Sequence, residues 1–435
     1  MRTDLPEAFV RRIRAQLGAG SEAFFEAMSQ PPVRGLRMNP LREGGRVPFR
    51  DAGDRIPWCP EGWEIPADST AGVTIAHEAG AFYLQEPGAM IPARVMDARP
   101  GERILDLCAA PGGKSTQMGA DMRGEGLLVC NEPVPRRAAI LSRNMERMGI
   151  PHSAVICAWP EKLADRWSEG FDGVMVDAPC SGEGMFRRNP EAAAEWSEEK
   201  ALGCAARQRE ILEAAARMVR PGGRMVYATC TFHPAENEEQ VKGFLRAHPE
   251  FEAEGFTLPG ADGSGGMFTC WPHLSRGEGQ FTALLRKKGD APARLPGGEA
   301  GFRMNPEARK MLRTWPDGLE EPNALFGNTA VLLREIPDLA GIRVLRLGLH
   351  LAELRGKNWI PDHAAAVGPM TAGRTVTELD GKEALRYLAG ETVEGDAKGW
   401  TVMMHRGLAL GWGKGSDGII RNHYPRGLRN GKLTE

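Results

Sequence analysis

The chain has 435 residues, of which 42% are hydrophobic, so it is long enough for about two to four separate cores. Its net charge of −2 gives no general attraction to nucleic acid, and only a local cluster of positive charge would supply one. Eight cysteines occur without a C-x-x-C pair or paired histidines, which argues against a zinc site and a disulfide framework and favours reduced thiols in a cytoplasm. The N-terminal stretch lacks the apolar core of a signal peptide and no apolar run reaches about 18 residues, so neither secretion nor a membrane span is expected.

The first part of the chain, residues 1–77, mixes short helical stretches with segments broken by Pro and Gly, which predicts a small separate domain. From residue 78 to 288, short apolar runs alternate with glycine turns and helical patterns. Such alternation predicts an α/β domain whose parallel sheet is covered by helices on both faces. The runs expected to form strands are 104–107, 127–130, 154–157, 173–176 and 225–228.

A glycine-rich turn follows the first of these runs and reads D-L-C-A-A-P-G-G-K-S from Asp106 to Ser115. It is not a P-loop, because Cys108 stands where the first glycine is needed, and it does not match the G-x-G-x-x-G fingerprint. Its small residues predict a tight strand-to-helix turn whose backbone approaches a ligand with an amino-acid carboxylate. S-adenosylmethionine is such a ligand, although a glycine turn alone is more often structural.

Glu132 follows the second apolar run. Rossmann-like folds place an acid at this position against ribose hydroxyls, which makes Glu132 a candidate cofactor ligand. An acid after a strand also occurs without any function, so this assignment depends on the neighbouring glycine turn.

Two cysteines follow two further strands: Cys180 lies in D-A-P-C-S-G (177–182) and Cys230 in Y-A-T-C-T (227–231). The ends of parallel strands are where α/β sheets hold their reactive groups. A lone cytosolic cysteine is usually buried and inert, but a pair at adjacent strand ends favours a thiolate nucleophile. The other cysteines without such a setting are expected to be core or surface residues: Cys59, Cys130, Cys157, Cys204 and Cys270.

A thiolate near a methyl-donor site points to C5 of cytosine, an atom too weakly nucleophilic to attack a methyl sulfonium unaided. Addition of a thiolate at C6 turns the ring into an enamine whose C5 accepts the methyl group, after which a base removes the C5 proton and the thiol leaves. Asp177, at the end of the fourth strand, is well placed for hydrogen bonding at N3 and the exocyclic amine. The target base must be flipped or single-stranded, which requires additional RNA-gripping domains.

Residues 289–301 are broken by Pro and Gly and predict a linker, and residues 302–435 contain alternating, β-like segments. Between Lys414 and Lys432, five basic residues stand against the single acid Asp417 and are interleaved with His423 and Tyr424. Cations among stacking aromatics are typical of RNA binding, and the alternative is a solvated surface loop. The basic residues are Lys414, Arg421, Arg426, Arg429 and Lys432.

Taken together, the motifs resemble the RNA (cytosine-5)-methyltransferases of the Nop/Sun type, and within them the bacterial ribosomal RNA enzymes of the RsmF kind. The resemblance covers nearly the whole chain, from Arg37-Met38-Asn39 to the G-W-G-K-G-S (411–416) and N-H-Y-P-R-G (422–427) strings. Its other motifs are Gln85-Glu86-Pro87, the turn 105–114, Glu132 with Arg137, Asn144, Arg147 and Gly149, the cysteine motifs 177–187 and 227–238, and L-G-L-H (347–350).

The resemblance implies roles for individual residues. Cys230 is the expected C6 nucleophile, Cys180 promotes product release, and Asp177 and Lys114 contact the target cytosine. No metal ligand is expected. After the third strand many members have an Asp that contacts the cofactor, whereas this chain reads C-A-W-P-E (157–161), so no adenine contact is assigned there and cofactor affinity is expected to differ. The residues expected to bind S-adenosylmethionine are Cys108, Ala109, Ala110, Pro111, Gly112, Gly113, Lys114, Glu132, Arg137 and Asp177.

The resemblance also implies the architecture. We expect a Rossmann-like class I methyltransferase core with a mostly parallel seven-stranded sheet, a small N-terminal α+β domain, and a C-terminal extension that ends in a PUA-like β module. The predicted divisions are an N-terminal RNA-binding domain (1–77), a methyltransferase domain (78–288), a linker (289–301), a connecting domain (302–371) and a PUA-like RNA-binding module (372–435).

The leading hypothesis is methylation of cytosine C5 in ribosomal RNA, with the decoding region of 16S rRNA as the expected target because RsmF-type relatives modify it. The expected partner is ribosomal RNA or the small ribosomal subunit, with no membrane. The same chemistry on 23S rRNA or transfer RNA stays open, because the catalytic motifs are shared. A further alternative is a non-catalytic RNA-binding assembly factor, against which the intact Cys180, Cys230, Asp177 and Lys114 argue.

Overall fold

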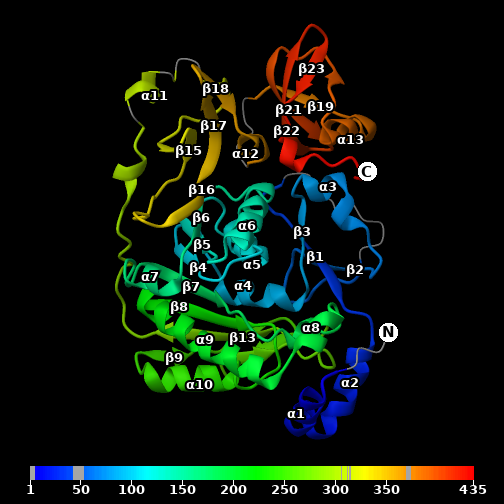
Figure 1. Cartoon of the computed structure of the whole chain (residues 1–435), viewed down its shortest axis with the longest axis vertical. Helices are drawn as coiled ribbons and strands as arrows, with labels where there is room; N and C mark the ends of the chain where they lie inside the picture. The colour runs from blue at the N-terminus through cyan, green and yellow to red at the C-terminus, as the bar shows by residue number, and fades with distance from the viewer. Residues whose placement is uncertain (1–4, 43–52, 305, 311, 313–314, 369–373) are drawn as a thin grey trace.

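The computed structural model describes residues 5–42, 53–304, 306–310, 312, 315–368 and 374–435. Figure 1 shows the N-terminal part in blue, a central α/β part in cyan and green, and a C-terminal extension from yellow to red. The predicted boundary between residues 371 and 372 lies outside the described residues, and the other predicted boundaries stay predictions. No helix in the described part of the chain has the length and apolar character needed to cross a membrane.

The centre of the molecule is a large, mainly parallel sheet with the strand order β12-β13-β8-β7-β4-β5-β6-β16, and β9 pairs with β13. Pairing is parallel from β8 through β7, β4 and β5 to β6, and antiparallel at β13 and β16. The strands are β4 (Arg103–Asp106), β5 (Leu127–Asn131), β6 (Ser153–Cys157), β7 (Phe171–Asp177), β8 (Val219–Thr229), β9 (Phe251–Ala253), β12 (Met267–Thr269), β13 (Phe281–Lys287) and β16 (Arg343–Leu347).

Helices cover both faces of this sheet. Successive strand residues point to opposite faces, so buried strands present apolar side chains on each face for helices to cover. Leu105 of β4 belongs to the same hydrophobic cluster as Ile211 of α9, whereas its neighbour Ile104 belongs to a second cluster with Met118 of α5 and Leu141 of α6. The predicted fold class is confirmed, and antiparallel strands at the edges extend the sheet to nine strands instead of seven. The helices are α4 (Ile91–Met96), α5 (Gly113–Asp121), α6 (Pro135–Arg147), α7 (Pro160–Ala164), α8 (Pro190–Glu195), α9 (Glu198–Met218) and α10 (Glu238–Ala247).

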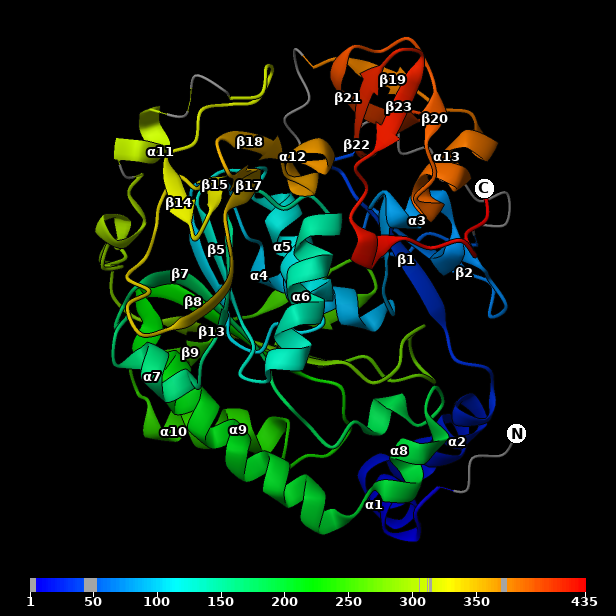
Figure 2. The ribbon, with the colours of Figure 1, turned by 45° about the horizontal axis from the view of Figure 1, so that its top comes forward.

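The N-terminal part combines helices with a three-stranded sheet of order β2-β1-β3. Its third strand, β3, lies beyond the predicted boundary at residue 77. Helices α1 and α2 extend away from this sheet and lie beside α8 in both views (Figures 1 and 2). The elements are α1 (Glu7–Leu17), α2 (Ser21–Ser29), β1 (Arg34–Met38), β2 (Gly62–Ile65), α3 (Ile75–Glu78) and β3 (Phe82–Leu84).

The C-terminal extension forms a four-stranded sheet of order β14-β15-β17-β18 and a five-stranded sheet of order β19-β21-β22-β23-β20. One of its strands, β16, belongs to the central sheet, where it pairs with β6. The elements are α11 (Pro306–Lys310), β14 (Ala324–Phe326), β15 (Thr329–Leu332), β17 (Leu349–Arg355), β18 (Asn358–Pro361), α12 (His363–Val367), β19 (Val376–Glu378), α13 (Gly381–Ala389), β20 (Val393–Glu394), β21 (Gly399–His405), β22 (Leu408–Ser416) and β23 (Ile419–Asn422), and a separate hairpin joins β10 (Phe256–Leu258) to β11 (Ala261–Gly263).

The end of the chain packs against its beginning. Leu36 and Phe82 of the N-terminal sheet share one hydrophobic cluster with Tyr387 and Leu388 of α13. The backbone N–H of Thr434 donates to the carbonyl oxygen of Val73 at 2.8 Å, and that of Ile75 donates to Thr434 at 3.0 Å. The terminal β module is therefore fixed to the N-terminal sheet, as its place next to α3 in Figure 1 shows.

Gly80, between α3 and β3, lies where the N-terminal part comes close to the end of α6, so a substitution there probes this contact. Its φ is +71°, and a β-carbon there would lie 1.9 Å from the carbonyl oxygen of Arg147. We expect Gly80→Ala to lower the free energy of unfolding by about 2–4 kcal/mol, because left-handed strain and displacement of the α6 backbone add. Chemical denaturation measures this loss.

The matched control is Gly101→Ala. Gly101 has a φ of +87°, but a β-carbon there would meet nothing within 4 Å. It is expected to cost only the strain of about 1–2 kcal/mol. Equal losses for the two variants would contradict a steric role of the contact with Arg147.

Candidate active site

The glycine turn joins β4 to α5 and is built around Asp106. Asp106 is fully buried, and its Oδ2 accepts a hydrogen bond of 2.6 Å from the Ser115 hydroxyl. Its Oδ1 has no well-formed hydrogen bond within the described structure. Gly112 takes a left-handed φ of +113° immediately before α5, which bends the chain from strand to helix.

Side chains from other elements hold the carbonyl groups of this turn. Arg37 of β1 donates to the oxygen of Gly113 at 3.1 Å, and Asn144 of α6 donates to that of Pro111 at 2.8 Å. Arg137 of α6 donates to the oxygen of Ala110 at 3.0 Å. The turn is therefore fixed in one conformation from two sides.

The turn fits the amino-acid part of S-adenosylmethionine. Ala109, Ala110 and Gly112 add little side-chain bulk, so a ligand can approach the backbone. The first turn of α5 presents N–H groups without intrahelical partners, which suit a carboxylate. The free Oδ1 of Asp106 is a buried acceptor that suits an ammonium group.

The predicted ribose ligand, Glu132, lies directly after β5. Its side chain is nearly buried, its Oε1 accepts from the N–H of Val134 at 2.9 Å, and its Oε2 pairs with Arg137 at 3.1 Å. Each oxygen retains a further lone pair for a hydroxyl donor. After β6, where many family members have an Asp, this chain has Cys157 to Trp159 and so no carboxylate. The Cys157 thiol donates to the oxygen of Pro133 at 3.2 Å, and Trp159 is 66% exposed.

The two cysteines come together because β7 and β8 are parallel neighbours, with Asp177 opposite Ala228. The sulfur atoms of Cys180 and Cys230 lie 3.2 Å apart, and the N–H of Cys230 donates to the Cys180 sulfur at 3.3 Å. The hydrogen bond with Cys230, together with burial, raises the pKa of Cys180 well above its usual range. Cys180 is therefore a neutral thiol at neutral pH.

Lys114 and Asp177 complete the group. Lys114, at the start of α5, donates to the Asp177 carboxylate at 2.8 Å. Burial opposes the charge of Lys114, but attraction to Asp177 and Cys230 outweighs it, so the pKa of Lys114 is raised. The structure thus brings together all the predicted catalytic residues, and places the positive charge of Lys114 within electrostatic reach of Cys230.

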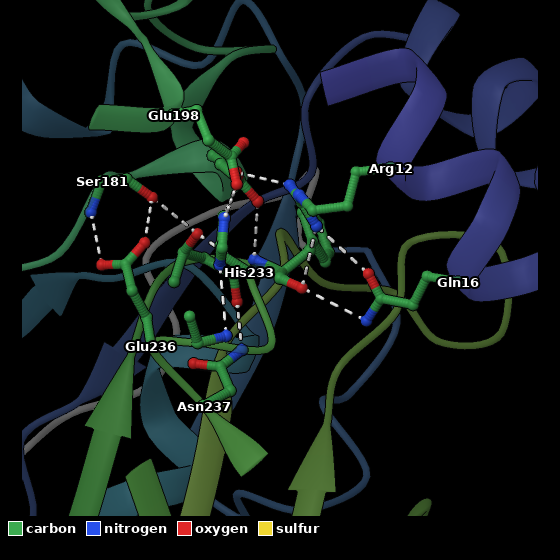
Figure 3. A network of polar contacts seen from close by, with 11 residues as sticks. Arg12, Gln16, Ser181, Glu198, His233, Glu236 and Asn237 are labelled. Atoms are coloured by element: carbon green, nitrogen blue, oxygen red, sulfur yellow. Dashed lines mark hydrogen bonds and ion pairs between the residues drawn. The ribbon is translucent and has the colours of Figure 1, made fainter. Parts of the chain in front are cut away.

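Buried polar side chains hold the two segments that carry the cysteines (Figure 3). Glu236 accepts the N–H of Ser181 at 2.9 Å and the amide of Gln208 at 3.0 Å, and the Ser181 hydroxyl also donates to it. Asn237 accepts from the Thr229 hydroxyl at 2.5 Å and donates to the oxygen of Thr231 at 2.8 Å. Asn237 therefore binds the residues on both sides of Cys230.

Sequence reasoning gave no role to Asp106, Glu236 or Asn237. The signal was present, because Asp106 is an acid in an apolar run and the other two end the second cysteine motif. Arg12, which reaches the Cys180 segment, gave no local signal, because its partner Glu183 is 171 positions away in the chain.

Comparisons with known proteins place the chain in a family. The model described as 16S rRNA methyltransferase RsmB/F matches residues 93–286, the N-terminal domain of 16S rRNA methyltransferase RsmF matches 5–87, and the methyltransferase RsmF PUA domain matches 374–430. Ribosomal RNA small subunit methyltransferase F of Cronobacter sakazakii is 32% identical over 475 positions, which cover 99% of this chain and 97% of the relative. The protein of the same name from Salmonella enteritidis is also 32% identical, covering 98% and 97%.

The chain belongs to the RsmB/F family of 16S rRNA methyltransferases. Solved structures agree on the fold. A methyltransferase homolog from Pyrococcus horikoshii has a TM-score of 0.58 at 24% identity and covers 66% of this chain and 96% of its own. NSun6 from the same organism, solved with SFG, has a TM-score of 0.56 at 21% identity and covers 66% and 99%.

Membership of the RsmB/F family confirms several predictions at once. The chain is an RNA cytosine-5 methyltransferase, and S-adenosylmethionine is its cofactor. The PUA domain predicted at the C-terminal end is confirmed as well. The roles of the single residues in the site stay predictions.

The buried Asp106 predicts how stability depends on pH. Burial, partly offset by the Ser115 hydroxyl, raises the pKa of Asp106 to about 7. An unfolded chain has an aspartate pKa of about 3.9, so the protonated form is favoured by folding, and this stabilisation is present below about pH 4 and lost as the pH rises through about 7. The difference corresponds to about 4 kcal/mol.

We therefore expect Asp106→Asn to show a weaker decline of unfolding free energy between pH 4 and 7 than the unmodified enzyme, measured by denaturant titration at each pH. Asp165→Asn is the control, because Asp165 is exposed at the end of α7. The control is expected to keep the original pH slope. Identical slopes for all three proteins would show that Asp106 is ionised throughout.

Proposed function

We propose that this enzyme methylates C5 of a cytosine in 16S rRNA, in the decoding region of the small ribosomal subunit, through a covalent bond between Cys230 and C6. The observation that carries the chemistry is the pair of sulfur atoms 3.2 Å apart at the end of β7 and β8. The ribosomal target is supported by the family and by relatives that are small subunit methyltransferases. The decoding region rests on the resemblance to RsmF-type enzymes.

In this proposal Cys230 acts as the nucleophile. Its thiolate forms a bond to C6, the electron pair of the C5–C6 double bond forms a C4–C5 double bond, and the pair of the C4–N3 double bond moves to N3. Lys114, which interacts electrostatically with Cys230, and Asp177, to which it donates, would serve as a donor and an acceptor for the polar edge of the ring. The target cytosine enters the site unpaired, either flipped out of an RNA helix or from a single-stranded segment.

The cofactor is held by the glycine turn, Asp106 and Glu132. When bound, S-adenosylmethionine supplies an electrophilic methyl group on a sulfonium centre. Bonds from β1 and α6 fix the turn that would hold the cofactor, and Lys114 links this turn to the catalytic group.

Cys180 acts in product release. After loss of the C5 proton to a base, the C6–sulfur bond breaks and its electron pair returns to Cys230. The Cys180 thiol keeps its proton because its pKa is raised, and it lies 3.2 Å from the departing sulfur. Its S–H group can therefore stabilise the thiolate that leaves.

The C-terminal module supports an RNA partner. The ammonium group of Lys414 lies 5.2 Å from the centre of the Trp400 ring, and the His423 ring lies 4.5 Å from the same ring. Burial, followed by the charges of Lys414, Arg355 and Arg421, lowers the pKa of His423. A cluster of cations beside aromatic rings suits RNA phosphates and bases.

One predicted member of this surface is not available. Tyr424 is 4% exposed, and its ring packs against those of Tyr387 and His363. It therefore belongs to the core and does not offer a stacking face to RNA.

The eight free thiols support a cytoplasmic location, which stays part of the proposal.

The proposal predicts loss of transfer in Cys230→Ala. The purified enzyme is incubated with isotope-labelled S-adenosylmethionine and separate 16S rRNA, 23S rRNA, transfer RNA and small subunits, and 5-methylcytosine is mapped by bisulfite sequencing. We expect a mark in 16S rRNA or the subunit, reduced by about 10³-fold or more without the nucleophile. Cys204→Ala, which removes a thiol from α9, is the control and is expected to keep the mark.

Full activity of Cys230→Ala would refute the assigned nucleophile. A mark only on 23S rRNA or transfer RNA would keep the chemistry and change the substrate. Absence of any mark with every RNA and subunit would favour a non-catalytic assembly factor.

Cys180→Ala is expected to trap the enzyme on its substrate. Without the neighbouring thiol the C6–sulfur bond breaks slowly, so a protein–RNA adduct should accumulate to a large fraction of the enzyme and survive denaturing electrophoresis. The double variant Cys180→Ala, Cys230→Ala should form none. If the single variant turns over normally, Cys180 has no role in release.

A further inference from the structure

The first two helices contact both segments that carry the catalytic cysteines. We name residues 7–29 the α1–α2 hairpin and residues 230–237 the Cys230 loop. Phe9 of α1 packs edge-on against Phe186, with ring centres 5.2 Å apart, and Phe24 of α2 packs edge-on against Phe232 at 5.1 Å. Phe186 follows Cys180 and Phe232 follows Cys230, so one apolar cluster joins the hairpin to both.

An ion pair lies next to this cluster, because the guanidinium group of Arg12 is 5.4 Å from the centre of the Phe9 ring. Figure 3 shows Arg12 pointing from its helix into the polar network. Arg12 of α1 donates to Oε1 of Glu183 at 2.5 Å, and the side chain of Glu183 is fully buried. The other oxygen of Glu183 accepts the N–H of Phe232 at 3.1 Å. Arg12 also donates to the carbonyl oxygen of Phe232 at 3.3 Å.

The hairpin therefore binds the carbonyl group of Phe232 directly and its N–H group through Glu183. Gln16, one turn after Arg12, gives the same carbonyl oxygen a second hydrogen bond of 3.3 Å. One residue beyond Glu183, the N–H of Gly184 donates to the carbonyl oxygen of Cys230 at 3.0 Å. The Cys230 loop is thus fixed by hydrogen bonds on each side of Thr231.

The geometry of Glu183 depends on Arg12. A buried carboxylate needs a partner charge, and Arg12 is the only cation with which Glu183 forms an ion pair within the described residues. Without Arg12, Glu183 is expected to turn toward solvent or take up a proton. Either change removes or weakens its bond to Phe232, two residues after the nucleophile.

We propose that Arg12 is a positioning residue, which through Glu183 holds the Cys230 loop in the conformation that directs the sulfur toward C6 of the cytosine. The inference rests on the proposed function and goes beyond it, because it makes the α1–α2 hairpin part of the catalytic apparatus. The hairpin belongs to the segment for which the sequence predicts RNA binding alone.

The test compares Arg12→Gln with the unmodified enzyme in the full-length chain. We expect kcat to fall by about 10- to 100-fold, because a displacement of about 1 Å at a nucleophile has this effect. The KM for RNA and the affinity for S-adenosylhomocysteine should stay within about three-fold, because the guanidinium group of Arg12 is bonded to Glu183 and Phe232 and does not touch the glycine turn. Arg12→Lys, which keeps the charge beside Glu183, should recover most of kcat.

The matched control is Arg217→Gln. Arg217 pairs with Asp165 at 2.8 Å, but this ion pair is exposed and lies at the end of α9, near the start of β8 and away from Cys230. Its removal should leave kcat unchanged. A loss in Arg12→Gln that appears only in the KM for RNA, or a wild-type kcat, would overturn the inference.

A second measurement needs no RNA. The rate at which iodoacetamide alkylates Cys230, followed by peptide mass spectrometry, reports how mobile and accessible the Cys230 loop is. The rate should rise by about three-fold or more in Arg12→Gln and stay constant in Arg217→Gln. Equal rates in the three proteins would overturn the inference. If the unmodified enzyme transfers no methyl group, the proposed function fails, but this comparison still decides the role of Arg12.

If Arg12→Gln does not fold, Gln16→Ala replaces it. This variant removes the second bond to Phe232 and leaves Glu183 paired. We expect Cys230 alkylation to rise by about two-fold with little change in Tm. An unchanged rate would count against the hairpin as a positioning element.

Discussion

The parallel pairing of β7 with β8 is the constraint on which the site depends. It sets Asp177 opposite Ala228, so the segments that follow leave the sheet side by side and bring two sulfur atoms to 3.2 Å. Between Cys230 and Asn237 the chain is neither helix nor strand, and its backbone polar groups need other partners. Side chains provide them, and several connect the loop to other elements: Arg12 and Gln16 of α1, Glu183 after Cys180, and Gln208 of α9. The catalytic geometry is therefore a property of the whole fold and not of the two motifs alone.

These partners carry charge into the interior, which has consequences for stability. Burial raises the pKa of Glu236, although hydrogen bonds from Ser181 and Gln208 oppose this. Glu183 is compensated by Arg12 from the first helix, and breaking a buried pair of this kind typically costs about 3–5 kcal/mol. The N-terminal helices are thus coupled energetically to the active site. At the other end of the chain, the terminal β module shares a hydrophobic cluster with the N-terminal sheet, so its cationic face keeps a fixed position relative to the cysteines.

Features encoded by local pattern could be predicted, and features made by distant contacts could not. Alternating strands and helices indicated the sheet, and the strand-end positions of Cys180 and Cys230 predicted that they would meet. The addition of β16 to the sheet was not predictable, because a strand from the C-terminal extension pairs with β6 far earlier in the chain. Tyr424 was expected to face RNA, but it packs against His363 and Tyr387, which no local pattern encodes. Arg12 stayed hidden for the same reason, since only the folded chain brings it to Glu183.

The geometry also supports the different roles proposed for two apparently equivalent thiols. Two sulfur atoms at 3.2 Å cannot both carry a full negative charge without strong repulsion, so ionisation of one keeps the proton on the other. The hydrogen bond with Cys230 and burial raise the pKa of Cys180, which assigns the retained proton to it. Lys114, held by Asp177, interacts with Cys230 and places positive charge on that side of the pair. The proposed mechanism therefore obtains a nucleophile and a neighbouring proton donor from one pair of identical side chains, because the surrounding charges are distributed unequally between them.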